Sequence, residues 1–262
     1  NQQKINFFTY ISHDLKTPLT LILSPLQRLI QQPQISNNDK EKLEVIYRNA
    51  NRMNYLINEL LTFSKIEMKQ MRISVRKGDI MHFLEELSHI FDIVAGEREI
   101  DFIVNLEDTE EEVWFSPSKL ERILYNLLSN AFKYTQPGGY VKLSAKLIKE
   151  EKETFVQISV KDNGRGIPKE AQEQIFESYY QVEKRDHREG FGLGLSLTHS
   201  LIHMHKGEIR VESEINKGSD FIVTLNVSED AYNPDERSSE NITTEEIQKY
   251  NQRIKETIEL IP

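Results

Sequence analysis

The residues with the clearest chemical potential lie near the amino terminus, where His13 is followed by Asp14, Thr17 and Pro18. In a helix, Thr17 lies one turn after His13 on the same face, about 6 Å away. A neutral imidazole becomes a nucleophile when a carboxylate keeps one ring nitrogen protonated and leaves the other lone pair free. Asp14 could do this. The alternative is that His13 is an ordinary surface histidine on a bundle helix.

Pro18 favours the chemical interpretation of His13. A proline in a helix interior cannot donate to the carbonyl of Asp14, and its ring crowds that turn at a cost of about 3 kcal/mol. We infer that the chain uses the resulting bend beside the histidine. For Thr17, the structural alternative is a hydroxyl that bonds back to the carbonyl of His13.

A second group of chemically competent residues falls on a predicted helix over 118–133. Asn126, Asn130 and Lys133 are spaced at i, i+4 and i+7, so they share one helix face. An amide oxygen is a suitable ligand for Mg²⁺, which keeps most of its water and bridges phosphates, while a lysine balances phosphate charge. The alternative is a helix with polar residues on its solvent side, which would explain any one of these three residues but explains all three together poorly.

Two glycine-containing stretches follow this helix. Asp162 ends a predicted strand and precedes Gly164 and Gly166. A carboxylate there can accept from an exocyclic amine such as that of adenine, and the glycines let a ligand approach the backbone. The alternative is a tight turn. The run over 190–195 opens a helix, whose free amides favour phosphate, although such a run alone is a weak signal.

Hydrophobic periodicity predicts the elements that position these residues. Apolar residues spaced three and four apart predict one helix over 3–31, ending at Pro33, and a second that follows turn and N-cap residues over 36–39 and continues to about Met68. This hairpin cannot bury both apolar stripes alone. A second copy would close a four-helix bundle, so we expect a homodimer.

From residue 71 the pattern is that of an α+β domain. Helices are predicted over 80–94, 118–133 and 193–205. Strands are predicted over 71–75, 101–105, 113–115, 140–148, 154–161, 208–213 and 219–226. Helices grouped against a mostly antiparallel sheet indicate an α+β sandwich. The charged segment 169–189 is expected to be a mobile lid, with His187 as a solvated lid residue. Residues 228–241 have the composition of an acidic linker, and 243–260 could form one more amphipathic helix.

Composition narrows the class of protein. The chain has 262 residues, enough for two domains, and its net charge of −9 argues against a nucleic-acid partner. It has no cysteine, which excludes disulfides and thiolate metal sites. No apolar run approaches the roughly 18 residues of a membrane span, so we expect a soluble fragment whose membrane and sensing segments lie upstream.

The motifs resemble those of the sensor histidine kinases of two-component signalling. Ser12 to Leu19 looks like the H box, which carries the phospho-accepting histidine at the place of His13. The N, G1, G2 and G3 boxes of the catalytic domain are matched, in order, by 126–135, 162–167, 190–195 and 218–221, with an F box at 175–180. The catalytic domain of that family shares its ATP-binding fold with gyrase-type topoisomerases and mismatch-repair ATPases.

The resemblance implies a division of the chain into three parts. These are an antiparallel helical hairpin that forms a dimeric four-helix bundle over 1–70, an α/β sandwich ATP-binding domain of the histidine kinase/gyrase type over 71–228, and an acidic linker with a further helix over 229–262. Hybrid members of the family continue into a receiver domain at this point.

The resemblance also assigns roles to individual residues. His13, Asp14 and Thr17 would be catalytic, and Asn130 would be the Mg²⁺ ligand. The nucleotide-binding residues would be Asn126, Asn130, Lys133, Tyr134, Asp162, Gly164, Gly166, Ile167, Gly190, Gly192, Leu193, Gly194 and Ser219. Ser116 departs from the family pattern, since many relatives have an aspartate there.

The implied function is a histidine kinase core that uses ATP and Mg²⁺. It would phosphorylate His13, pass the phosphoryl group to an aspartate of a response regulator receiver domain, and also act as a phosphatase. It would work in the cytoplasm as part of a membrane-bound bacterial sensor. The rivals are an ATPase of the same fold that uses ATP as a conformational clamp, and an inactive module that only dimerises and relays.

Overall fold

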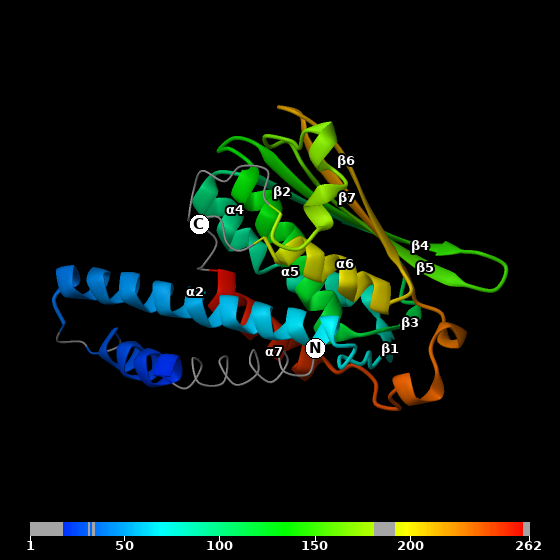
Figure 1. The fold of residues 1–262 in the computed structure, drawn as a ribbon, viewed down its shortest axis with the longest axis horizontal. Helices are drawn as coiled ribbons and strands as arrows, with labels where there is room; N and C mark the ends of the chain where they lie inside the picture. Colours follow the sequence, from blue (N-terminus) through cyan, green and yellow to red (C-terminus); the bar gives the residue numbers. More distant parts are fainter. Residues whose placement is uncertain (1–17, 31, 33–34, 181–191, 259–262) are drawn as a thin grey trace.

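The structure is a computed structural model that describes residues 18–30, 32, 35–180 and 192–258 (Figure 1). The predicted site residues His13, Asp14, Thr17 and Gly190 lie outside the described residues, as does His187. In the described ranges no helix combines the length and the apolar character that crossing a membrane requires.

The amino-terminal part contains two helical stretches. Residues 18–30 are helical, and α2 spans Asn37–Glu67. The side chain of Ser36 caps α2 by accepting from the amide of Asp39, so the cap lies within the predicted stretch 36–39. Leu19 is buried against Ala50 and Ile57. Other apolar side chains of these helices are exposed, namely Leu21, Ile22, Leu29, Val45, Ile46 and Met53.

The remainder of the described chain is built around a five-stranded sheet. Its strands, in spatial order, are β2 (Asp101–Leu106), β4 (Tyr140–Lys149), β5 (Thr154–Asp162), β7 (Gly218–Asn226) and β6 (Glu208–Glu214). Only β2 and β4 pair in parallel, and the other pairs are antiparallel. This confirms the predicted sheet type.

Helices cover one face of this sheet, as Figure 1 shows. They are α3 (Ile80–Ser88), α4 (Phe91–Arg98), α5 (Pro117–Tyr134) and α6 (Gly194–Met204). Alternate residues of the central strands, such as Val141 and Leu143, point toward the helices and are fully buried. The rings of Phe91 and Phe132 stack with centroids 5.8 Å apart. A small antiparallel sheet of β1 (Arg76–Asp79) and β3 (Glu112–Phe115) lies beside this core.

Two predicted elements differ from the structure. The strand expected over 71–75 is β1 instead, because ladder pairing with β3 begins at Arg76 and only Val75 of the predicted stretch makes a bridge. The helix expected over 80–94 is divided into α3 and α4. The hydroxyl of Ser88 bonds back to the carbonyl of Glu85 at this division, while the apolar period continues through it, so the period does not reveal the break.

The expected lid is partly a packed segment. Its first part forms two short 3₁₀ helices, η1 (Lys169–Ala171) and η2 (Gln174–Phe176), whose Ala171 and Ile175 are buried in the main core. Residues 181–189 of the expected lid lie outside the described residues. The charged composition therefore did not reveal that residues 169–176 pack into the core.

The carboxy-terminal segment is packed rather than a free linker. It contains η3 (Glu229–Ala231), η4 (Pro234–Glu236) and the helix α7 (Thr244–Ile258). Tyr232 is buried, and Ile247, Tyr250 and Ile254 of α7 belong to the main core. The average composition of residues 228–241 is polar, so it suggested a linker. The segment is held in place by a few apolar residues and by backbone pairing, and an average composition shows neither.

Candidate active site

The first component of the site is one face of α5. Pro117 occupies the first turn, where its missing amide is tolerated, and apolar residues anchor the helix to the sheet. Asn126 is buried, and its Nδ2 donates to Thr198 Oγ1 over 2.6 Å. Asn130 lies one turn further and is half-buried. No described residue bonds to the Asn130 side chain, so its amide oxygen can serve a ligand.

The second component is the carboxylate at the end of β5. Asp162 Oδ1 accepts from the amide of Gly164 over 2.8 Å and from the amide of Ser219 over 3.3 Å. Burial raises the pKa of the Asp162 carboxyl, while these two bonds oppose the rise. No donor among the described residues reaches Oδ2, which leaves this oxygen to accept from a base.

The turn after Asp162 packs against the end of α5. Gly164 lies against the backbone carbonyl of Tyr134, and the amide of Arg165 donates to the same oxygen. The guanidinium carbon of Arg165 lies 4.1 Å from the centroid of the Tyr134 ring, and Lys133 Nζ lies 4.7 Å from it. Cation–π contact thus holds two positive charges beside the aromatic ring. This end of α5 is suited to a charged, aromatic ligand.

Ser213 of β6 links the rest of this turn to β7. Its hydroxyl accepts from the amide of Ile167 over 2.8 Å and donates to the carbonyl of Gly218 over 2.9 Å. The Ser213 and Ser219 hydroxyl oxygens are 3.0 Å apart. Gly166, between Arg165 and Ile167, has a positive φ of 70°. The backbone around Asp162 is therefore fixed by bonds from three segments.

The third component is the amino terminus of α6. The helix begins at Gly194, and Leu193 precedes it without any side-chain cap, so the first amides remain available. A Cβ added to Gly194 would lie 2.5 Å from Asn126 Oδ1, so only glycine permits this close approach. Gly192, just before, has a positive φ of 69°. An uncapped helix start with this approach to α5 favours an anion such as phosphate.

The structure places the described site residues on four segments. They come from α5, the turn after β5, the start of β7 and the start of α6, and they comprise Asn126, Asn130, Lys133, Tyr134, Asp162, Gly164, Gly166, Ile167, Gly192, Leu193, Gly194 and Ser219. Arg165, Thr198 and Ser213 also contact these residues and were not predicted from the sequence. Thr198 could have been found, because it lies one helical turn after Gly194.

The donor set fits a purine nucleotide. Asp162 offers a buried acceptor for an exocyclic amine, Lys133 and Arg165 supply positive charge, and the start of α6 offers free amides. Within the described ranges no three histidine, aspartate or glutamate side chains are grouped to hold a metal. A metal at Asn130 would therefore rely on phosphate oxygens and water for its other ligands. The sandwich and its site define an ATP-binding domain.

Comparison with known families supports this class. Residues 3–69 match the His Kinase A (phospho-acceptor) domain, and residues 115–229 match the histidine kinase-, DNA gyrase B-, and HSP90-like ATPase. Histidine kinase P4 of Formosa agariphila is 37% identical over 86% of this chain and 16% of the relative. Sensor histidine kinase WalK of Bacillus subtilis is 33% identical over 88% of this chain and 38% of the relative.

Solved structures share the fold. The full-length ShkA structure in complex with AMPPNP gives a TM-score of 0.71 at 24% identity, covering 85% of this chain and 46% of that one. Histidine kinase AdeS of Acinetobacter baumannii gives 0.57 at 24% identity, covering 82% and 98%. The chain belongs to the sensor histidine kinases, a family of ATP-dependent protein-histidine kinases, and contains both of their core modules. It spans less than two fifths of the length of the two curated relatives.

Proposed function

We propose that this chain is a kinase core that phosphorylates His13 from Mg-ATP and then passes the phosphoryl group to an aspartate of a receiver domain. The observation that carries the proposal is the meeting of Asp162, the Asn126–Asn130 face and the uncapped start of α6 at one end of the sandwich. The matched phospho-acceptor domain over 3–69 supplies the residue to be modified.

Each component has a role in binding ATP. Asp162 Oδ2 accepts from the adenine amine, and Tyr134, held by Arg165, lies beside the base. The first amides of α6 and Lys133 bind the phosphates. Asn130, assisted by Asn126, would hold Mg²⁺, and the bound metal would neutralise charge on the phosphoryl oxygens. The surroundings of Asp162 exclude much of the water, so these contacts are stronger than in bulk solvent.

The transfer step requires the other module. A ring nitrogen of His13 attacks the γ-phosphorus in line while Asp14 holds or takes the proton on the other nitrogen, and ADP leaves. Thr17, four residues on in the sequence, positions a water molecule for hydrolysis of the receiver's aspartyl phosphate. The exposed apolar side chains of the hairpin, such as Leu21 and Met53, support a homodimer in which a second copy covers them. We place this core in the cytoplasm, within a membrane-bound sensor.

Labelling with radioactive ATP tests the proposal directly. The chain should gain phosphate that is labile in acid and stable in alkali, His13→Gln should gain none, and both should bind ATP equally because only the acceptor is lost. Asp162→Asn should lose ATP binding and labelling together. In the same assay with phosphorylated regulator, Thr17→Ala should keep labelling of His13 but slow receiver dephosphorylation about tenfold, or about 1.4 kcal/mol.

The rivals make different predictions in these assays. ATP hydrolysis without protein phosphate would indicate a conformational clamp, and absence of both ATP binding and labelling would indicate an inactive module. Equal labelling of the His13→Gln variant would show that the acceptor is another residue. Parallel loss of both activities in Thr17→Ala, or loss of neither, would make Thr17 structural.

A further inference from the structure

The short connection between α2 and β1, residues 68–75, is packed against the carboxy-terminal segment. We call residues 68–75 the hinge, because they join the helical hairpin to the ATP-binding domain. Ile73 and Val75 are 5% and 0% exposed, and they form one cluster with Tyr232, which is 2% exposed. The Tyr232 hydroxyl donates to the carbonyl of Asn226 over 2.6 Å. The ring that covers the hinge is therefore itself anchored to the end of β7.

Backbone pairing also joins the hinge to this segment. The amide of Val75 donates to the carbonyl of Glu236 over 2.8 Å, and the carbonyl of Val75 accepts from the amide of Ser238 over 2.9 Å. Further along, the amide of Ile242 donates to the carbonyl of Lys77 over 3.4 Å. Because β1 pairs with β3 along its other edge, residues 236–242 occupy the edge that β3 leaves open.

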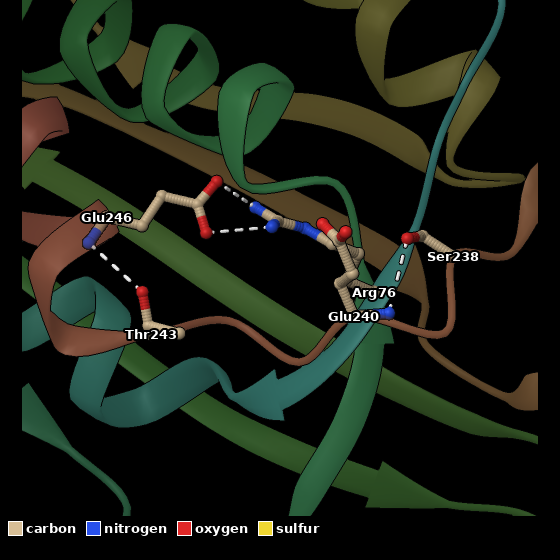
Figure 2. A network of polar contacts seen from close by, with 5 residues as sticks. All are labelled: Arg76, Ser238, Glu240, Thr243 and Glu246. Carbon is tan, nitrogen blue, oxygen red and sulfur yellow. Dashed lines mark hydrogen bonds and ion pairs between the residues drawn. The ribbon is translucent and has the colours of Figure 1, made fainter.

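A largely buried ion pair fixes the start of α7. Figure 2 shows the Arg76 guanidinium and the Glu246 carboxylate joined by two bonds, of 2.7 and 2.5 Å. Their side chains are only 13% and 30% exposed. The Thr243 hydroxyl accepts from the amide of Glu246 and caps this turn. The paired geometry is the bidentate form that gives an arginine–carboxylate pair its directionality.

Side chains of the carboxy-terminal segment also pack closely against β1 and the ATP-binding domain. A Cβ added to Gly78 of β1 would lie 2.8 Å from Ile242 Cδ1, so a larger residue there would require the Ile242 side chain to shift. On α7, Tyr250 packs its ring 5.8 Å from that of Phe83. The helix contacts α3 and α5 of the ATP-binding domain and also α2 of the hairpin. It thus touches both parts that the hinge joins.

We propose that residues 229–258 form an intramolecular clamp, which fixes the hinge and holds the ATP-binding domain in a defined position on α2. With the clamp closed, Ile73 and Val75 are buried and the backbone of Val75 is bonded through both its amide and its carbonyl, while Arg72 and Ser74 are exposed. Opening the clamp would free three residues and add about 10 Å to the reach of the connection. The clamp therefore restricts how far the ATP-binding domain can move relative to α2.

A charge swap across the ion pair tests the clamp. Glu246→Arg and Arg76→Glu each place like charges together and should open it, while the double variant Arg76→Glu/Glu246→Arg should close it again. Hydrogen exchange of the Val75, Ser238 and Ile242 amides should become at least tenfold faster in each single variant and return toward the original rate in the double variant. Exchange in β5 and ATP binding serve as controls for an intact domain.

Distances measured between spin labels report the position of the domain itself. The chain has no cysteine, so cysteines can be placed at the exposed Lys65 of α2 and the exposed Lys146 of β4, with labelled chain diluted into unlabelled chain. The distance distribution should broaden in Glu246→Arg and narrow again in the double variant. Fast exchange in α7 with unchanged exchange at Val75, or with an unchanged distance distribution, would overturn the proposal.

A milder variant covers the case in which Glu246→Arg unfolds the domain, which faster exchange in β5 would reveal. Glu246→Gln keeps the shape and one acceptor, and it should give a smaller increase in exchange at the same three amides. No change there would also overturn the clamp. None of these measurements uses phosphoryl transfer, so they fail or succeed independently of the kinase activity proposed above.

Discussion

Acidification should destabilise the ATP-binding domain through one histidine. His205 follows α6 and is 0% exposed. Its Nδ1 lies 2.9 Å from the carbonyl of Leu201, which can only accept, so this nitrogen carries the proton. Its Nε2 accepts from the amide of Ser116 over 3.2 Å, so the ring is neutral. Protonation would place a second N–H against the Ser116 donor in a fully buried site.

The magnitude follows from the two pKa values. Burial lowers the pKa of His205 from its ordinary 6.5 to about 4, with a further lowering from Lys119 and an opposing effect of the bond to Leu201. Above pH 6.5 His205 is neutral in both the folded and the unfolded chain, so it does not reduce the free energy of unfolding. Between pH 6.5 and 4 only the unfolded chain binds this proton, so stability falls as the pH falls. A difference of 2.5 pKa units corresponds to about 3 kcal/mol.

Denaturant unfolding at pH 7, 6, 5 and 4 measures this loss. His205→Gln cannot titrate, yet its amide can donate to Leu201 and accept from Ser116. The variant should be less stable at pH 7, and its deficit should shrink by about 3 kcal/mol by pH 4. Carboxylates titrate alike in both proteins and cancel in the difference. His82→Gln, which removes an exposed histidine, should follow the unmodified chain. If the His205→Gln and unmodified proteins lose stability in parallel, the buried neutral imidazole is not the cause.

Three other predictions concern the site and the assembly. Gly194→Ala should weaken ATP binding at least tenfold in calorimetry, about 1.4 kcal/mol, because its Cβ would meet Asn126 Oδ1 at 2.5 Å; Gly96→Ala, with no heavy atom within 4 Å, is the matched control, and equal affinities would disprove the close approach. Asn130→Asp should slow autophosphorylation from Mg-ATP at least tenfold without unfolding the domain, because it alters the charge and geometry at a metal-facing position, whereas retained autophosphorylation at an unchanged Mg²⁺ dependence would place the metal ligand elsewhere. Light scattering at micromolar concentration should give twice the chain mass, and a monomer mass would count against the exposed apolar hairpin as a dimer surface.

Local geometry explains why much of the site was predictable from the sequence. Asn126, Asn130 and Lys133 share a face of α5 because the helix period is fixed by the backbone, whatever lies beside it. Asp162 ends a strand whose alternation was readable, and Gly194 begins a helix at the expected place. The ordered motifs then linked these local features to one family. Each of these inferences needed only residues close together along the chain.

The tertiary structure decided what depends on distant surfaces. That Asn126 bonds to Thr198, or that Ser213 fixes the turn after Asp162, follows from the packing of separate elements. The carboxy-terminal segment shows the same limit, since its average polarity indicated a linker. Tyr232 is nevertheless buried and Glu246 pairs with Arg76, 170 residues away in sequence. Periodicity shows which face of an element seeks a partner, but only the folded chain determines which surface meets that face.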